Sequence, residues 1–78
     1  MVNEQITVKK EQAIALAHGY MRDCKMYMEK GNRIFAARAR GAALVWEFFL
    51  YFEMGADDCE WKTFEYRELE NYADEMGL

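Results

Sequence analysis

The sequence predicts an all-α fold, an antiparallel three-helix bundle with helices at about residues 8–30, 33–54 and 58–76. Three observations lead to this prediction. The chain contains no proline, so no residue forces a break inside a helix. Hydrophobic residues make up 53% of its 78 residues and aromatic residues 15%, more than a disordered chain carries. Apolar residues recur at helical spacing, and Gly31 and Gly55 divide them into segments. No linker or repeat interrupts residues 1–78, which we expect to form a single domain.

The first predicted helix, residues 8–30, is amphipathic. Its apolar stripe consists of Ala13, Leu16, Ala17, Tyr20, Cys24 and Tyr27. Thr7 is the expected N-cap. Gly31 and Asn32 supply a helix-ending glycine and an N-cap in adjacent positions, which predicts a tight turn and antiparallel packing of the first two helices. His18 falls on the polar face, where we expect it to be exposed to solvent.

The second predicted helix, residues 33–54, is apolar around almost its whole circumference. A helix of this kind is normally buried, so we expect neighbouring helices to cover it on more than one side. The simplest role for its aromatic half is in the core; this group is Trp46, Phe48, Phe49, Tyr51 and Phe52. Gly41 lies in mid-helix, where glycine costs up to about 1 kcal/mol relative to alanine. We expect close packing against Tyr20 or Tyr27 to compensate for this cost.

The third predicted helix, residues 58–76, begins after Asp57, which has the spacing of a capping residue three positions before Glu60. Its apolar face is expected to consist of Trp61, Leu69, Tyr72, Ala73 and Met76. Glu65 interrupts this face. Either Glu65 pairs with a basic residue at the edge of the core, such as Arg38, or the helix begins later than Asp57 indicates.

No pattern in the sequence is typical of catalysis or of metal binding. His18 is the single histidine and lacks a cysteine, serine or aspartate partner at a helical spacing that makes a catalytic pair, so we predict no catalytic, cofactor-binding or metal-binding residues and no enzymatic activity. In an up-down-up bundle, Cys24 and Cys59 lie roughly 20 Å apart, which excludes a disulfide. The first residues lack the apolar core of a signal peptide, and residues 41–52 are too short for a membrane span. We therefore expect a soluble, cytoplasmic protein.

The charge of −4 is distributed unevenly along the chain. Residues 1–55 carry eight basic and six acidic side chains, a balance of +2, whereas residues 56–78 carry two basic and eight acidic ones, a balance of −6. Aromatic residues beside mixed charge are typical of protein-binding hot spots. The partner-binding residues that we predict are Glu60, Phe64, Tyr66, Arg67, Glu70 and Asp74.

The leading functional hypothesis is a small acidic interaction module that regulates or inhibits a larger partner protein by binding its surface. A partner with a basic, nucleic-acid-binding groove suits the acidic third helix. The most concrete example of this class is a phage or mobile-element inhibitor such as an anti-CRISPR protein, on the grounds of size and composition. Two alternatives remain open. One is a nucleic-acid-binding regulator that uses Arg33, Arg38 and Arg40, and the other is a self-assembling structural subunit. Monomer and homodimer, the latter joined through leftover faces of residues 33–54, also remain alternatives.

Overall fold

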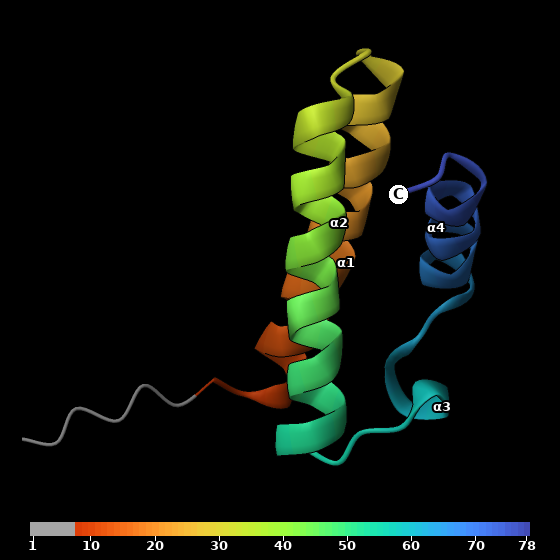
Figure 1. The fold of residues 1–78 in the computed structure, drawn as a ribbon. Coiled ribbons are helices and arrows are strands. Elements are labelled where there is room, and N and C mark those ends of the chain that lie inside the picture. Colours follow the sequence, from red (N-terminus) through yellow and green to blue (C-terminus); the bar gives the residue numbers. More distant parts are fainter. Residues whose placement is uncertain (1–7) are drawn as a thin grey trace, which may run out of the picture.

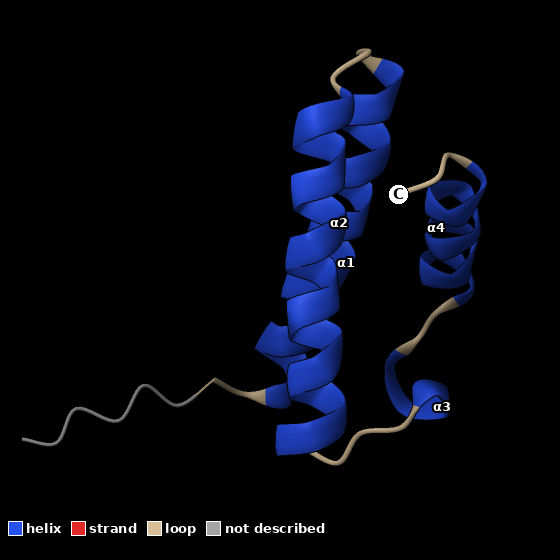
Figure 2. Cartoon of the chain, in the orientation of Figure 1, coloured by secondary structure: helices blue, strands red, loops and turns tan. Residues whose placement is uncertain are grey.

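The computed structural model describes residues 8–78, and every regular element in this part of the chain is helical (Figure 1, Figure 2). Two long helices form an antiparallel hairpin, and two short helices lie beside it. The elements are α1 (Lys10–Glu29), α2 (Arg33–Phe48), the π-helix η1 (Phe49–Glu53), α3 (Asp58–Trp61) and α4 (Phe64–Glu75). The all-α prediction is confirmed, and the third predicted helix is present as two pieces, α3 and α4.

The turn between α1 and α2 forms as the sequence predicts. Gly31 has a φ of +77°, the left-handed conformation that glycine adopts without steric cost. The Asn32 side chain then caps α2 by accepting a hydrogen bond of 3.1 Å from the Phe35 backbone N–H. At the start of α1 the N-cap is Lys9, whose backbone N–H donates to the Gln12 side chain at 3.0 Å. The N-cap that we predicted, Thr7, lies outside the described residues.

The second helix ends in a π-helical turn. The N–H of Met54 donates to the Phe49 carbonyl five residues earlier, at 3.2 Å, and Gly55 with a φ of +61° terminates the helix. The predicted span of residues 33–54 is therefore confirmed, with wider winding over its last turn. Leu50 points into the core, whereas Phe48 and Phe52 remain stacked on the outer side with ring centroids 6.1 Å apart.

The prediction of one continuous helix over residues 58–76 is wrong, because the helix is interrupted at Lys62 and Thr63. Asp57 caps α3 by accepting from the Glu60 N–H at 3.0 Å, as predicted, but the chain leaves the helix at Lys62. Thr63 then begins α4 by accepting from the Tyr66 N–H at 3.1 Å. A threonine hydroxyl competes with helix continuation, because it offers the backbone a cap instead. The helix that carries Glu65 therefore begins later than Asp57 indicates, which was the second of the two alternatives. Glu65 pairs with Arg22 rather than with Arg38.

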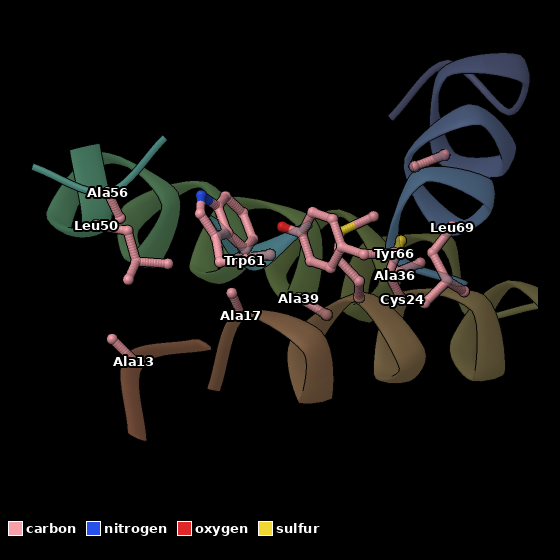
Figure 3. Close-up of a cluster of buried hydrophobic side chains, with 13 residues drawn as sticks. Ala13, Ala17, Cys24, Ala36, Ala39, Leu50, Ala56, Trp61, Tyr66 and Leu69 are labelled. Carbon is pink, nitrogen blue, oxygen red and sulfur yellow. The ribbon is translucent and has the colours of Figure 1, made fainter. Parts of the chain in front are cut away.

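The core is built from small residues between α1 and α2 and from larger residues on the α3–α4 side. Figure 3 shows the ring of Trp61 beside that of Tyr66, and their ring centroids are 4.9 Å apart. The buried apolar residues are Ala13, Ala17, Met21, Cys24, Ala36, Ala39, Ala43, Leu50, Ala56, Trp61, Tyr66, Leu69 and Ala73. The predicted apolar face is wrong in part: on α4 the buried residues are Tyr66, Leu69 and Ala73, whereas Tyr72 is half-buried and Met76 is exposed.

Three predictions about burial are wrong. The aromatic half of the second helix does not lie wholly in the core, since Phe48 and Phe52 are each more than half exposed. Gly41 is exposed, and a side chain at this position would meet nothing within 4 Å, so it makes no close contact inside the chain. His18 is buried, because α3 crosses over it and its Nε2 lies 3.3 Å from the carbonyl oxygen of Trp61.

Two further predictions concern cysteines and membranes. Cys24 is buried, Cys59 is exposed, and both thiols are free, as the separation predicted for an antiparallel arrangement requires. Burial raises the pKa of the Cys24 thiol, so this group behaves as a small apolar side chain. Over residues 8–78, no helix combines the length and the hydropathy needed to cross a membrane.

Candidate functional site

The six predicted partner-binding residues lie on α3 and α4 but do not share one surface. Glu60 lies on α3, and the other five lie along α4. The three carboxylates of the set point toward bases of the same chain, Tyr66 points into the core, and Phe64 and Arg67 point outward. The structure therefore separates residues that hold the fold together from residues that are available to a partner.

Two of the predicted carboxylates, Glu60 and Asp74, make ion pairs with the two long helices. Glu60 binds Lys10 of α1 at 2.8 Å, and this ammonium holds the pKa of the Glu60 carboxyl below its ordinary value. Asp74 lies 3.6 Å from Arg40 of α2. Within residues 8–78, Arg40 is the one arginine of the second helix that pairs with an acid of α4. The Lys10–Glu60 pair is well exposed and contributes little to stability.

Glu70 belongs to a second, more buried group of polar side chains. Its carboxylate accepts from Lys62 at 3.1 Å, and the Lys62 side chain is only 12% exposed. Lys62 also lies 3.8 Å from Asp58. Asp58 in turn accepts a hydrogen bond from the Tyr51 hydroxyl of η1. This chain of contacts ties the α3–α4 junction to the end of the second helix, so Glu70 has a structural role.

Tyr66 makes the most buried polar contact in the described chain. Its hydroxyl donates to the Glu47 carboxylate of α2 at 2.7 Å, and Glu47 is only 5% exposed. Burial raises the pKa of both groups, and the shared hydrogen bond raises that of Tyr66 further. Sequence reasoning missed this pair. Glu47 is the single acid between Arg33 and Phe52, and that isolation is the one signal that could have indicated a specific partner.

The outward face of α4 carries the residues that remain available to a partner. Its members recur at helical spacing and are all exposed; they are Phe64, Arg67, Glu68, Asn71 and Glu75. Phe64 is 77% exposed. Of the two aromatic residues predicted to bind a partner, Phe64 is therefore exposed and Tyr66 is buried. Within residues 8–78, neither Glu68 nor Glu75 has a base at salt-bridge distance.

A second apolar surface runs along α2 and η1, on the side away from α4. Its exposed members are Ile34, Val45, Phe48 and Phe52, which are between 54% and 80% exposed. Gly41 lies in the middle of the same line. We call this set the outer stripe of α2. The residues that face α4 from α2, Arg40 and Glu47, lie on the opposite side of the helix.

A shallow groove borders the outer stripe where α1 and α2 meet. It has a volume of about 370 Å³ and is lined by Tyr20, Asp23, Tyr27, Phe35, Arg38, Ala39 and Ala42. Tyr27 and Phe35 form an edge-to-face pair in its wall, with ring centroids 5.4 Å apart. The groove is apolar and open to solvent, and it adds to the exposed apolar surface of the outer stripe.

The three arginines proposed as a nucleic-acid site do not gather at one place. Arg40 faces α4, where it pairs with Asp74 and donates to the Met21 sulfur at 3.4 Å. Arg33 donates to the Gly77 carbonyl at 3.4 Å. Arg38 lies on the other side of α2, over the ring of Phe35.

No protein-family model, no curated protein and no solved structure matches this chain. The two surfaces that the described residues leave open to a partner are the outward face of α4 and the outer stripe of α2. Among residues 8–78, no three histidine, cysteine or acidic side chains gather in a group that could hold a metal ion.

Proposed function

We propose that this protein is a small interaction module that regulates or inhibits a larger partner protein by covering part of the partner's surface with the outward face of α4. The observation that carries the proposal is Phe64, which is 77% exposed in the first turn of α4. A large, rigid aromatic side chain gains most when a partner pocket removes it from water. Glu68 and Glu75 lie on the same face and are not occupied by bases of residues 8–78.

The charge of this part of the chain indicates the chemistry of the partner. Residues 56–78 carry a balance of −6, but Glu60, Glu65, Glu70 and Asp74 pair with bases of the same chain. The negative charge of the outward face of α4 comes from Glu68 and Glu75, which exceed Arg67 by one charge, so this face favours a basic patch over nucleic acid. A groove that binds phosphates through lysine and arginine is the complementary surface, and the module would compete with nucleic acid for it. A phage or mobile-element inhibitor of the anti-CRISPR kind is one protein of this class; size and composition support that example.

The test is a set of matched charge reversals on immobilised protein exposed to a host lysate. We expect the wild-type chain to retain a basic protein at low salt and to release it at high salt or on addition of heparin, a polyanion that mimics nucleic acid. The double variant Glu68→Lys/Glu75→Lys should lose the captured protein. The control Glu11→Lys/Glu29→Lys makes the same charge change on exposed positions of α1 and should retain it. Equal retention by both double variants would refute the proposal.

Phe64→Ala tests the apolar part of the same surface. Because hot-spot aromatics contribute about 2 kcal/mol or more, affinity for the captured protein should fall at least roughly tenfold. Phe64 makes little contact with its own chain, so the helical content should not change. An unchanged affinity would place the contact elsewhere on the molecule.

The rival function, a nucleic-acid-binding regulator, has less support in the geometry. Arg40 is occupied by Asp74, and Arg33 and Arg38 point to different sides of α2. The measurement that would favour it is a mobility shift of duplex DNA that the wild-type chain produces and Arg33→Gln/Arg38→Gln abolishes.

A further inference from the structure

The outer stripe of α2 has the spacing of a helix–helix seam. Besides its exposed apolar residues, the stripe passes through Arg38 and Gly41. Together these positions follow a strict alternation of four and three residues: Ile34, Arg38, Gly41, Val45, Phe48 and Phe52. This is the heptad pattern with which one helix packs against another in a coiled coil. No other part of residues 8–78 covers this seam, since Ile34 is 69% exposed, Val45 64% and Phe52 80%.

Gly41 has no explanation within a single chain. It is exposed in the middle of α2, and the position of its missing Cβ has no neighbour within 4 Å. Glycine at such a position weakens a helix by about 1 kcal/mol relative to alanine. A glycine in the centre of an apolar seam instead permits a close approach of a second backbone or a large side chain.

The size of the seam residues changes along the helix in a way that suits a second copy running in the opposite direction. The first half of the seam carries Gly41 and no aromatic residue, whereas the second half carries two phenylalanines, Phe48 and Phe52. In an antiparallel pair, the half with Gly41 in each copy meets the aromatic half of the other, and no phenylalanine of the seam faces another. A parallel pair would instead place Gly41 against Gly41 and each phenylalanine against its own copy, so the separation that the two helices require would differ along the seam.

The heptad positions fix the register of such a pair. In an antiparallel pair, the numbers of any two residues that face each other across the seam add up to the same value, which is 86 in this register. Ile34 then faces Phe52 of the second copy, Arg38 faces its Phe48, and Gly41 faces its Val45. The Arg38 guanidinium can lie on the face of the opposing Phe48 ring, a favourable cation–π arrangement.

Charge along the second helix selects the same direction. The first half of α2 and the turn before it are basic, with exposed Lys30, Arg33 and Arg38. The end of η1 and the segment after it are acidic, with exposed Glu53 and Asp57. Antiparallel copies bring the basic end of one chain alongside the acidic end of the other. Parallel copies would place Arg38 against Arg38, which is unfavourable.

The apolar area of the seam is sufficient for a specific dimer. Each exposed phenylalanine offers on the order of 100–200 Å², and the stripe with Phe35 offers roughly 500 Å² on one chain. Two copies would bury about 1,000 Å², the lower limit for a specific interface. We propose that a second copy of this chain occupies the outer stripe, with the two α2 helices antiparallel and Gly41 of each against Val45 of the other. This proposal is independent of the function proposed for α4, and it leaves both outward faces of α4 free, so a dimer presents two partner-binding surfaces.

Analytical ultracentrifugation and light scattering test the association. The wild-type chain should pass from monomer to dimer between low micromolar and near-millimolar concentration. Val45→Glu puts a charge at the centre of the seam and should raise the dissociation constant at least tenfold, while circular dichroism remains unchanged because Val45 is exposed in the monomer. Phe64→Glu is the matched control on α4 and should leave the dissociation constant unchanged. A wild-type chain that remains monomeric throughout, or a dimer indifferent to Val45→Glu, overturns the proposal.

Cysteine cross-linking tests the direction of the pair. In a Cys59→Ser background, mixed Ile34→Cys and Phe52→Cys chains should form a disulfide between the two variants. Neither variant should cross-link to itself, because antiparallel copies place two Ile34 positions about 27 Å apart. Disulfides within the Ile34→Cys population alone would indicate a parallel pair and overturn the proposed register.

Discussion

The hydrogen bond between Tyr66 and Glu47 is the contact whose loss should destabilise the fold most clearly. Tyr66→Phe removes the hydroxyl alone and keeps the ring that packs against Trp61. The hydroxyl is the one hydrogen-bond donor that the described chain supplies to the Glu47 side chain, which is only 5% exposed. The variant therefore leaves a buried carboxyl group without its partner.

The expected cost follows from the burial of both groups. A hydrogen bond to a charged group contributes about 1.5–3 kcal/mol, and an unsatisfied buried acceptor costs a similar amount. A domain of this size unfolds with a free energy of about 5–15 kcal/mol, so the loss is a large fraction of it. With a shift of about 4–8 °C per kcal/mol, Tm should fall by roughly 6–24 °C.

The loss of stability in Tyr66→Phe should also depend on pH, and the titration of Glu47 determines whether it grows or shrinks as pH rises. Burial raises the pKa of the Glu47 carboxyl above its ordinary value of 4.5. Just above pH 4.5 the folded state therefore holds more protons than the unfolded state, and stability falls as pH rises through this window. Glu47→Gln removes this titration and keeps an oxygen that can accept from Tyr66. We expect its stability relative to wild type to improve from pH 4 to pH 7, and the cost of Tyr66→Phe to be smaller at pH 4.

Thermal and urea unfolding, followed by circular dichroism from pH 4 to pH 8, measure these changes. Tyr72→Phe is the matched control, because Tyr72 is half-buried on the same helix and its hydroxyl makes no hydrogen bond within residues 8–78. It should change the unfolding free energy by less than about 0.5 kcal/mol. If Tyr66→Phe costs no more than Tyr72→Phe at pH 7, the buried pair does not stabilise the fold as we infer.

Three further predictions concern local conformation and alkaline pH. Thr63→Ala removes the cap of α4 and should lower the unfolding free energy by about 1 kcal/mol in urea titrations, and an unchanged value would mean that the cap contributes nothing. Gly31→Ala should destabilise the monomer by about 1 kcal/mol, because the φ of Gly31 is +77°. Gly41→Ala should stabilise the dilute monomer by up to about 1 kcal/mol, because Gly41 lies within a helix and has space for a side chain. Stabilisation by Gly31→Ala and destabilisation by Gly41→Ala would contradict these backbone conformations. Burial raises the pKa of Tyr51 to about 12 and also raises that of Tyr66, so the folded state holds more protons than the unfolded state above pH 10. Stability should therefore fall between pH 10 and pH 12, and absorbance at alkaline pH should show tyrosine ionisation coinciding with unfolding.

The features that the sequence predicted well depend on neighbouring residues. Gly31 with Asn32, and Asp57 with Glu60, specify turns and caps over three or four positions, and the structure contains both. The break at Thr63 is specified less strongly, because a threonine can either cap a new helix or remain within a continuing one. Because the helix is broken before Phe64, Trp61 does not have to share a face with Leu69 and Ala73, and the buried face of α4 consists of Tyr66, Leu69 and Ala73.

The features that the sequence did not reveal depend on contacts between distant residues. Helical periodicity placed His18 on a polar face, but the backbone of α3 covers it, and this contact spans 43 residues. Glu47 finds its partner 19 residues away on another helix. The same holds for the candidate site. Phe64 and Tyr66 could not be told apart from the sequence, and the occupation of Glu60, Glu70 and Asp74 by internal bases follows only from the arrangement of the helices.

The most direct test of the proposed function is photo-crosslinking from position 64 in the host cell. Replacing Phe64 by p-benzoylphenylalanine places a reactive ring at the N-terminal end of the outward face of α4, and replacing Met26 places it on an exposed part of α1 as a control. We expect a covalent adduct with one larger, basic protein from position 64 and none from position 26. Adducts of equal yield from both positions, or from position 26 alone, would contradict the assignment of α4 as the partner-binding surface.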